Sequence, residues 1–328
     1  MIHNNILDAM GNTPIIRLNK MVDDDSAEIL VKFEGLNVGG SIKTRTAYNM
    51  ILRAEEEGKI NKDSIIVEPT SGNQGIGLAL VGAVRGYKTI IIMPDSVSEE
   101  RRKLVKHYGA EVILVHDAGN IGKCIDECLQ LALKMQEEDE NVFVPQQFEN
   151  PANAEIQRKR TAVEILEQVG KPIHGFCAGI GTGGTLTGIG ETLKEANPDI
   201  EIWAVEPEDA AILSGGLIGT HIQMGIGDGL IPPILNTSIY SDICIVTDDE
   251  ALATAKELAI IAANALKNDT FKKIVSTYKK TFTSEERTRT YVNHNKLLRL
   301  YDGCIGVKTG FTKKSGRCLV GAAEKDGL

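Results

Sequence analysis

Short apolar runs alternate with longer amphipathic stretches along the first three quarters of the chain. The clearest strand-like runs are Thr89–Met93, Glu111–Val115, Val142–Val144 and Ile200–Val205. Segments of ten or more residues with helical periodicity lie between them. This alternation predicts an α/β fold in which a parallel sheet is covered by helices on both faces.

A glycine-rich turn at residues 37–45 leads directly into a predicted helix. Residues 28–33 before it alternate like a strand, and residues 44–58 after it have helical spacing. Lys43 is therefore expected on the first helical turn, where the helix dipole disfavours its ammonium form. A neutral amine is a nucleophile, so the pattern indicates a reactive lysine. A solvated lysine beside a tight turn is the alternative.

Two further loops connect apolar strands to helices. The first, Thr-Ser-Gly-Asn-Gln-Gly at 70–75, offers hydroxyls, an amide and backbone N–H groups, which suit a carboxylate. The second, Gly-Thr-Gly-Gly-Thr at 181–185, lets the backbone close on an anion, and the following helix favours a phosphate. This loop does not fit the GxxxxGK[ST] pattern. No acidic residue follows it in the way that a dinucleotide site requires.

These loops carry a resemblance that extends from Asn4 to about Lys256. The region resembles the cysteine synthase group of fold type II pyridoxal-phosphate (PLP) enzymes, which includes O-acetylserine sulfhydrylase and cystathionine β-synthase. The matching motifs follow in family order: Ile6–Pro14 with Arg17-Leu18, Gly39–Lys43, Thr70–Gly75, Gln146–Phe148, Gly181–Thr185, Val205–Pro207 and Gly225–Gly227. The resemblance implies two doubly wound α/β lobes, the smaller at about residues 45–145. Pyridoxal phosphate would lie between them, and the enzyme would be a homodimer acting on a small amino acid.

The resemblance also implies roles for individual residues. Lys43 would bind the cofactor covalently and take the substrate α-proton, and Asn73 would bind the cofactor 3′-oxygen. The cofactor phosphate would be held by Gly181, Thr182, Gly183, Gly184 and Thr185. The substrate carboxylate would be held by Thr70, Ser71, Gly72, Asn73 and Gln147.

Asp228 is a second candidate catalytic residue. It lies between two glycines in a loop that, by resemblance, borders the cofactor, so we expect it to handle a proton or water. An aspartate that stabilises the turn through side-chain to backbone hydrogen bonds is the alternative.

The implied reaction is a β-replacement of a transferase or lyase type in cysteine and amino-acid biosynthesis. An O-acetylserine- or serine-like amino acid would lose its β-substituent, and a sulfur nucleophile would replace it to give L-cysteine. The sequence departs from the usual family pattern at Thr44, Gln74, Gln157 and Arg160. These departures leave cysteine and homocysteine chemistry open as alternatives.

Composition adds expectations about compartment. The 328 residues suffice for two domains, and 42% hydrophobic with 25% charged residues is typical of globular proteins. We expect a cytoplasmic protein without a membrane partner, because no secretory pattern opens the chain and no stretch reaches membrane-spanning length. The cysteines show no CxxC pair or zinc spacing and the histidines are scattered, so we expect reduced thiols and no metal site. Cys124 and Cys128, four apart on a predicted helix, are expected to serve packing.

The charge changes near the end of the chain. Residues 260–328 carry 14 Lys and Arg against 6 Asp and Glu, a net +8, in a chain of net charge −9. This asymmetry suggests a different origin or partner. We expect no nucleic-acid partner, because the basic residues are spread without a motif. Segments 259–275, 293–298, 306–312 and 316–320 resemble a serine-type D-alanyl-D-alanine carboxypeptidase, whose KTG motif matches Lys308, Thr309 and Gly310.

The tail resembles only a fragment of that family, because no SxxK nucleophile motif lies far enough upstream of KTG. We therefore divide the chain into a cysteine synthase-like region at 1–256 and a partial α+β carboxypeptidase-like segment at 257–328. This join would truncate the large lobe and remove the serine or threonine that faces the cofactor's pyridine nitrogen. The alternatives to an active cysteine synthase are an inactive chimeric or misassembled product and a penicillin-binding carboxypeptidase.

Overall fold

The structure is a computed structural model that describes residues 2–18, 27–119 and 121–253, and four strands between residues 279 and 323. The chain divides into two compact units, Met1–Val246 and Thr247–Leu328. The expected boundary between residues 256 and 257 lies outside the described residues, so it stays a prediction. No helix of the described part is long and apolar enough to cross a membrane.

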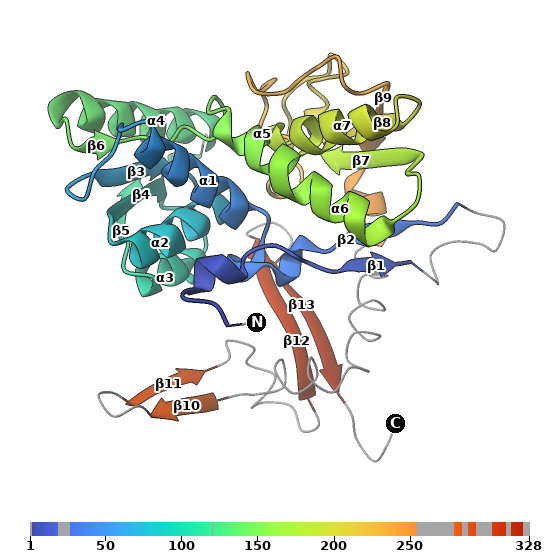
Figure 1. Cartoon of the computed structure of the whole chain (residues 1–328). Helices are drawn as coiled ribbons and strands as arrows, with labels where there is room; N and C mark the ends of the chain where they lie inside the picture. Colours follow the sequence, from blue (N-terminus) through green and yellow to red (C-terminus); the bar gives the residue numbers. More distant parts are fainter. Residues whose placement is uncertain are drawn as a thin grey trace. The chain divides into compact units, whose positions relative to one another are not determined.

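The first lobe of the larger unit is built on a four-stranded parallel sheet with the strand order β5-β4-β3-β6 (Figure 1). Helices cover both faces of this sheet. Successive residues of a strand point to opposite faces, so each strand packs against helices on both sides. Ile66 and Ile91 pack with α1, α2 and α3, whereas Val67 and Ile92 pack with α4. The elements are α1 (Lys43–Glu56), β3 (Ile65–Pro69), α2 (Asn73–Arg85), β4 (Lys88–Pro94), α3 (Glu99–His107), β5 (Glu111–Val115), α4 (Ile121–Glu138) and β6 (Val142–Phe143).

The packing role expected for two cysteines is confirmed in this lobe. Cys124 and Cys128 of α4 are both buried in the apolar cluster that contains Val67 and Ile92. Burial raises the pKa of both thiols, which keeps them protonated and unreactive.

The second lobe is built on a three-stranded parallel sheet with the order β7-β8-β9. One face packs on α6 and α7 around Leu186, Ile202 and Ala204. The opposite face presents Cys177 and Trp203, and Trp203 is 44% exposed. The elements are α5 (Ala152–Ile156), the π-helical η4 (Gln157–Thr161), α6 (Ala162–Val169), β7 (Gly175–Gly179), α7 (Gly184–Ala196), β8 (Glu201–Pro207), η5 (Glu208–Ala210) and β9 (Asp242–Val246).

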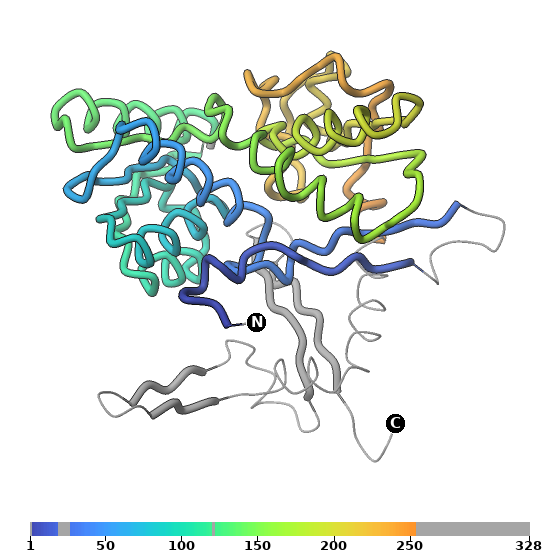
Figure 2. The backbone as a smooth tube through the Cα atoms, in the orientation of Figure 1, coloured from blue at the N-terminus to red at the C-terminus, as the bar shows by residue number. Residues whose placement is uncertain are grey.

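An N-terminal segment precedes the first lobe and contacts the second (Figure 2). Two short strands in it pair antiparallel, and Lys32 of the second strand forms an ion pair with Glu164 of α6 at 2.8 Å. The segment comprises η1 (Ile6–Ala9), β1 (Ile15–Arg17), β2 (Leu30–Lys32), η2 (Glu34–Leu36) and η3 (Val38–Gly40).

Arg45 of α1 joins this segment to both lobes. Its side chain is fully buried and donates hydrogen bonds to Glu34 at 2.8 and 2.9 Å and to Glu164 at 2.6 and 2.8 Å. Burial opposes its charge, but these hydrogen bonds outweigh that effect and raise the pKa of Arg45. Burial likewise opposes ionisation of Glu164, whose pKa the Arg45 and Lys32 hydrogen bonds lower to about 2. Arg45 and Glu164 therefore form a buried pair of opposite charges at neutral pH.

The described strands of the second unit form two antiparallel hairpins. The first is β10 (Lys279–Thr283) with β11 (Thr288–Val292), and the second is β12 (Cys304–Thr312) with β13 (Gly316–Ala323). Lys308, Thr309 and Gly310 lie on β12, where Lys308 is opposite Val320 and Gly310 is opposite Cys318. A strand is where the KTG motif of the carboxypeptidase family lies, but the role of these residues stays a prediction.

Candidate active site

Lys43 is the first residue of α1, as the sequence predicts. Its Nζ donates hydrogen bonds to Thr182 Oγ1 at 3.3 Å and to Gln147 Oε1 at 3.5 Å. Burial lowers the pKa of Lys43 to about 8, although the negative charges of Asp228 and Glu68 oppose that shift. A sizeable fraction of this amine is therefore neutral and nucleophilic near pH 7 to 8.

The turn before Lys43 depends on glycine. Gly39 and Gly40 have φ of 78° and 79°, in the left-handed region that side chains disfavour. A Cβ at Gly39 would also lie 2.3 Å from Thr44 Oγ1. Any larger residue at position 39 would displace the start of α1, and Lys43 with it.

The glycine-rich loop at 181–185 joins β7 to α7, as predicted. Gly183 has φ of 81°, and a Cβ at Gly184 would lie 2.3 Å from Asn153 Oδ1. No side chain caps the N-terminus of α7, whose first backbone N–H groups have no intrahelical partners. The loop thus forms a close-fitting cradle at a helix N-terminus, which fits a phosphate. Asn153 also fixes Thr182 through a 2.9 Å hydrogen bond to Oγ1.

The loop at 70–73 joins β3 to α2, again as predicted. Thr70 Oγ1 accepts a hydrogen bond from the Gly72 N–H at 3.2 Å, and no side chain caps α2 at Gly72. Asn73 begins the helix and is exposed to solvent. Arg101 of α3 donates to the Ser71 carbonyl at 2.8 Å and so brings a positive charge beside the loop. These features suit a substrate carboxylate.

The turn that carries Gln147 is held by Glu68, a residue to which the sequence alone assigned no role. Gln147 is buried, and the Glu68 carboxylate accepts hydrogen bonds from the backbone N–H groups of Gln146 and Gln147. Glu68 lies inside the apolar run that forms β3. A carboxylate inside a buried strand is costly without hydrogen-bond partners. The position of Glu68 in this apolar run is therefore the sequence signal that could have indicated a functional or structural role.

Asp228 lies in the loop at 225–229, close enough to Lys43 for their charges to interact. Although its side chain retains access to solvent, surrounding protein atoms raise the pKa of Asp228 by desolvation, and Lys43 and His221 oppose that rise. A Cβ at Gly181 would lie 3.5 Å from Asp228 Oδ2, so the aspartate borders the glycine-rich loop as well.

Three departures from the family pattern fall on buried positions behind Lys43. Thr44 Oγ1 and Gln74 Oε1 are buried without a hydrogen-bond partner in the structure. Gln157 begins the π-helical η4 and accepts a hydrogen bond from Thr161 Oγ1 at 2.7 Å. Thr44 lies on α1, and Gln74 and Gln157 contact Met50 and Thr46 of the same helix, so an effect on substrate choice would act through α1.

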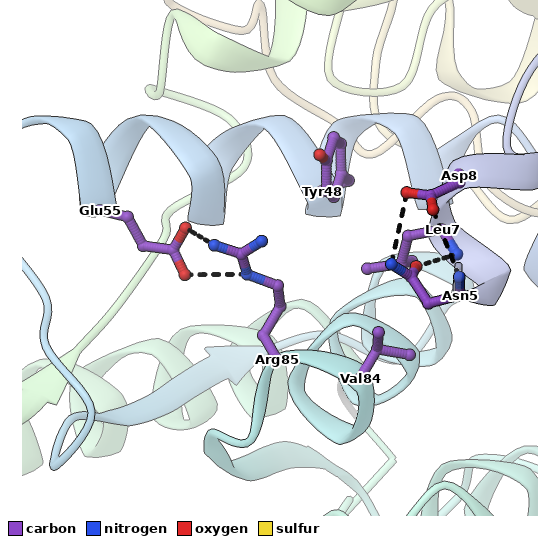
Figure 3. Close-up of a pocket in the computed structure, with 7 residues that line it drawn as sticks. All are labelled: Asn5, Leu7, Asp8, Tyr48, Glu55, Val84 and Arg85. Atoms are coloured by element: carbon purple, nitrogen blue, oxygen red, sulfur yellow. Dashed lines mark hydrogen bonds and ion pairs between the residues drawn. The ribbon is translucent and has the colours of Figure 1, made fainter. Parts of the chain in front are cut away.

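A separate hollow of about 290 Å³ lies between η1, α1 and α2 (Figure 3). Glu55 and Arg85 form an ion pair beside it, and Asp8 accepts hydrogen bonds from Asn5. It contains none of the predicted site residues. Across the described residues, no group of three or more His, Cys, Asp or Glu side chains could hold a metal ion.

The two α/β lobes, with a lysine at a helix start facing a glycine-rich loop, define a fold type II pyridoxal-phosphate enzyme. The family model for pyridoxal-phosphate dependent enzymes matches residues 6–263. The chain therefore belongs to this family, and its relatives place it in the cysteine synthase group. A second model, for D-alanyl-D-alanine carboxypeptidase, matches residues 236–328 and agrees with the resemblance of the tail.

The chain is 48% identical over 256 residues to a cysteine synthase of Staphylococcus aureus, which covers 78% of this chain and 81% of that protein. It is 45% identical over 258 residues to a probable cysteine synthase of Bacillus subtilis, covering 78% and 82%. A hydrogen sulfide-producing enzyme from Fusobacterium nucleatum superposes with a TM-score of 0.72 at 41% identity, covering 79% and 86%. An O-acetylserine dependent cystathionine beta-synthase from Helicobacter pylori superposes with a TM-score of 0.72 at 36% sequence identity. The match covers 79% of this chain and 84% of that chain.

These findings confirm the expected family, fold class and cofactor. Pyridoxal phosphate is the cofactor of this family, and the cradle at Gly184, the uncapped α7 and the Lys43 amine fit it. The comparisons support neither an inactive chain nor a penicillin-binding enzyme in place of a cysteine synthase. The expected loss of the residue facing the pyridine nitrogen concerns residues beyond 256, most of which lie outside the described part.

Proposed function

We propose that this enzyme replaces the β-substituent of O-acetylserine, or of a serine-like amino acid, with a sulfur nucleophile to give L-cysteine. The observation that carries the proposal is the meeting at Lys43 of Thr182 from the glycine-rich loop and Gln147 from the turn after β6. The identity to cysteine synthases over 78% of the chain supports the same reaction. A homodimer, as expected from the family, belongs to the proposal too.

Each loop has a distinct task in this proposal. The backbone N–H groups of Gly181, Gly183, Gly184 and Thr185, with Thr182, would hold the cofactor phosphate, and Asn73 would hold its 3′-oxygen. Thr70, Ser71, Gly72 and Gln147 bind the substrate carboxylate, beside the positive charge of Arg101. This arrangement fixes the substrate α-carbon close to the Lys43 amine, which is the main contribution of positioning to rate.

Proton transfer is assigned to Lys43. Pyridoxal phosphate, when bound, supplies an electron sink that weakens bonds at the substrate α-carbon. Lys43 Nζ takes the α-proton, acetate leaves the β-carbon, hydrosulfide adds there, and Lys43 returns a proton to the α-carbon. A pKa near 8 matches this cycle, because the amine must accept and release a proton near neutral pH.

The purified full-length chain, loaded with pyridoxal phosphate, tests the proposal. We expect L-cysteine from O-acetylserine and sulfide, measured by mass spectrometry. In parallel reactions, serine or cysteine replaces O-acetylserine, or homocysteine replaces sulfide. The rates of these reactions identify the preferred pair of amino acid substrate and sulfur nucleophile. L-cysteine formation from O-acetylserine and from serine with sulfide that is no faster than with free pyridoxal phosphate would contradict the proposed function.

Replacing Asp228 with asparagine is expected to lower turnover by roughly 10²-fold, because the amide is nearly isosteric but cannot accept a proton. The matched control is Asp63→Asn, an exposed aspartate outside the cleft. Steady-state kinetics of both variants provide the measurement. If Asp228→Asn keeps wild-type turnover, the aspartate serves the turn instead.

A further inference from the structure

Glu68 is a buried charged group to which the proposed mechanism gives no role. Its side chain lies at the end of β3, in Val67-Glu68-Pro69, with 1% of the residue exposed. Its two carboxylate oxygens accept hydrogen bonds from the Gln146 N–H at 3.0 Å and the Gln147 N–H at 3.2 Å. A buried carboxylate therefore binds two successive backbone donors of one turn.

That turn adopts a conformation that needs an external restraint. Gln146 has φ of 55°, in the left-handed region that is unfavourable for a residue with a side chain. The paired hydrogen bonds from Gln146 and Gln147 fix the orientation of both peptide N–H groups. Glu68 thus supplies the restraint on the unfavourable backbone.

The turn is connected to Lys43 through a short series of contacts. The Gln147 carbonyl accepts a hydrogen bond from Asn153 Nδ2 at 2.8 Å, and Asn153 Nδ2 also donates to Thr182 Oγ1 at 2.9 Å. Lys43 Nζ donates to both Thr182 and the Gln147 side chain. Any shift of the turn would therefore move Gln147 relative to Lys43.

We propose that Glu68 is a positioning residue, whose carboxylate holds the Gln146–Gln147 turn so that the Gln147 side chain faces Lys43 and the substrate carboxylate. The part concerning substrate rests on the proposed function. The contact between Glu68 and the turn does not depend on it.

The electrostatics of the site agree with this role. Desolvation raises the pKa of Glu68 to about 7, while the two backbone N–H groups and the Lys43 charge oppose that rise. Hydrogen bonds to an ionised carboxylate are stronger than those to a neutral group. The two backbone N–H groups of the turn therefore also favour the ionised form of Glu68.

Glu206 in the second lobe provides a matched control for Glu68. Val205-Glu206-Pro207 ends β8 in the same way, and Glu206 is 3% exposed. Glu206 accepts hydrogen bonds from the Leu213 N–H at 2.9 Å and the Ser214 N–H at 3.0 Å. It holds a different loop through the same kind of hydrogen bonds, so Glu206→Gln reproduces the loss of a buried carboxyl group without touching the Gln147 turn.

The experiment compares Glu68→Gln with Glu206→Gln in the full-length chain. Hydrogen exchange followed by mass spectrometry should show faster exchange at residues 146–147 in Glu68→Gln and at 213–214 in Glu206→Gln. The KM for O-acetylserine should rise about tenfold in Glu68→Gln with kcat within about threefold, because an interaction that binds substrate has been loosened. In Glu206→Gln the KM should stay within about twofold of the wild type.

Unchanged exchange at 146–147 in Glu68→Gln, or an equal rise of KM in both variants, would overturn the proposal. If Glu68→Gln does not fold, Glu68→Asp decides, since it keeps the charge but shortens the side chain. Partial protection at 146–147 with a raised KM supports positioning, and wild-type values for both refute it. If the wild type makes no cysteine, the proposed function fails, whereas the exchange data still test the Glu68 contact.

Discussion

Lys43→Ala is expected to abolish covalent attachment of pyridoxal phosphate and to lower cysteine formation by at least about 10³-fold. The physical reason is that Lys43 supplies both the amine that binds the cofactor and the base of the reaction. Absorption of the bound cofactor in the visible range, followed by borohydride reduction and peptide mapping, provides the measurement. Lys59→Ala, at an exposed lysine, is the control. A reduced adduct that persists in Lys43→Ala and maps to another lysine would contradict the assignment.

The cofactor-free protein offers a second test of the same residue. Because burial lowers the pKa of Lys43 from 10.5 to about 8, the unfolded chain binds more protons than the folded one between these values. The contribution of Lys43 to the free energy of unfolding therefore rises with pH from about 8 to about 10.5. Lys43→Met should be stabilising relative to the wild type below pH 8, and the difference should shrink above it. Urea unfolding of both proteins at several pH values measures this difference in the free energy of unfolding. A difference that does not change with pH would argue against a buried amine at position 43.

Arg45→Met is expected to lower the free energy of unfolding by about 3–5 kcal/mol, because it leaves the Glu34 and Glu164 carboxylates without their buried partner. Denaturant unfolding of the two proteins measures the loss. Arg53→Met is the matched control on the same helix, since the Arg53 side chain is 34% exposed and its ion pairs with Glu56 and Glu155 are partly screened. We expect a clearly smaller loss there, because solvent screens these ion pairs. Equal losses in the two variants would show that the Arg45 network adds little.

Much of the larger unit could be predicted from local pattern. The strands at 89–93 and 111–115 and the helix after Lys43 were expected within two residues of their observed bounds. β9 was not expected, because Asp242–Val246 is a short run that follows a long irregular segment. The pairing of Arg45 with Glu164 could not be predicted either, since 119 residues separate them and no local periodicity specifies such a contact.

The candidate site was likewise predictable only where its residues leave a local sequence pattern. Lys43 and the loops at 70–75 and 181–185 could be found because glycine and hydroxyl residues at a strand-to-helix turn leave a local signal. Glu68 could not be assigned a role, because the backbone donors that it binds come from a turn 78 residues later. The position of Asp228 near Lys43 depends likewise on the path of an irregular loop. Its catalytic role is still a prediction.

Trp203, on the open face of β8, has a spectroscopic consequence. It is the single tryptophan of the chain, and the residue is 44% exposed. Intrinsic fluorescence excited at the indole band therefore reports the surroundings of one strand of one lobe. A quencher in solution has direct access to it, while the sheet that carries Glu68 contributes no indole emission at all.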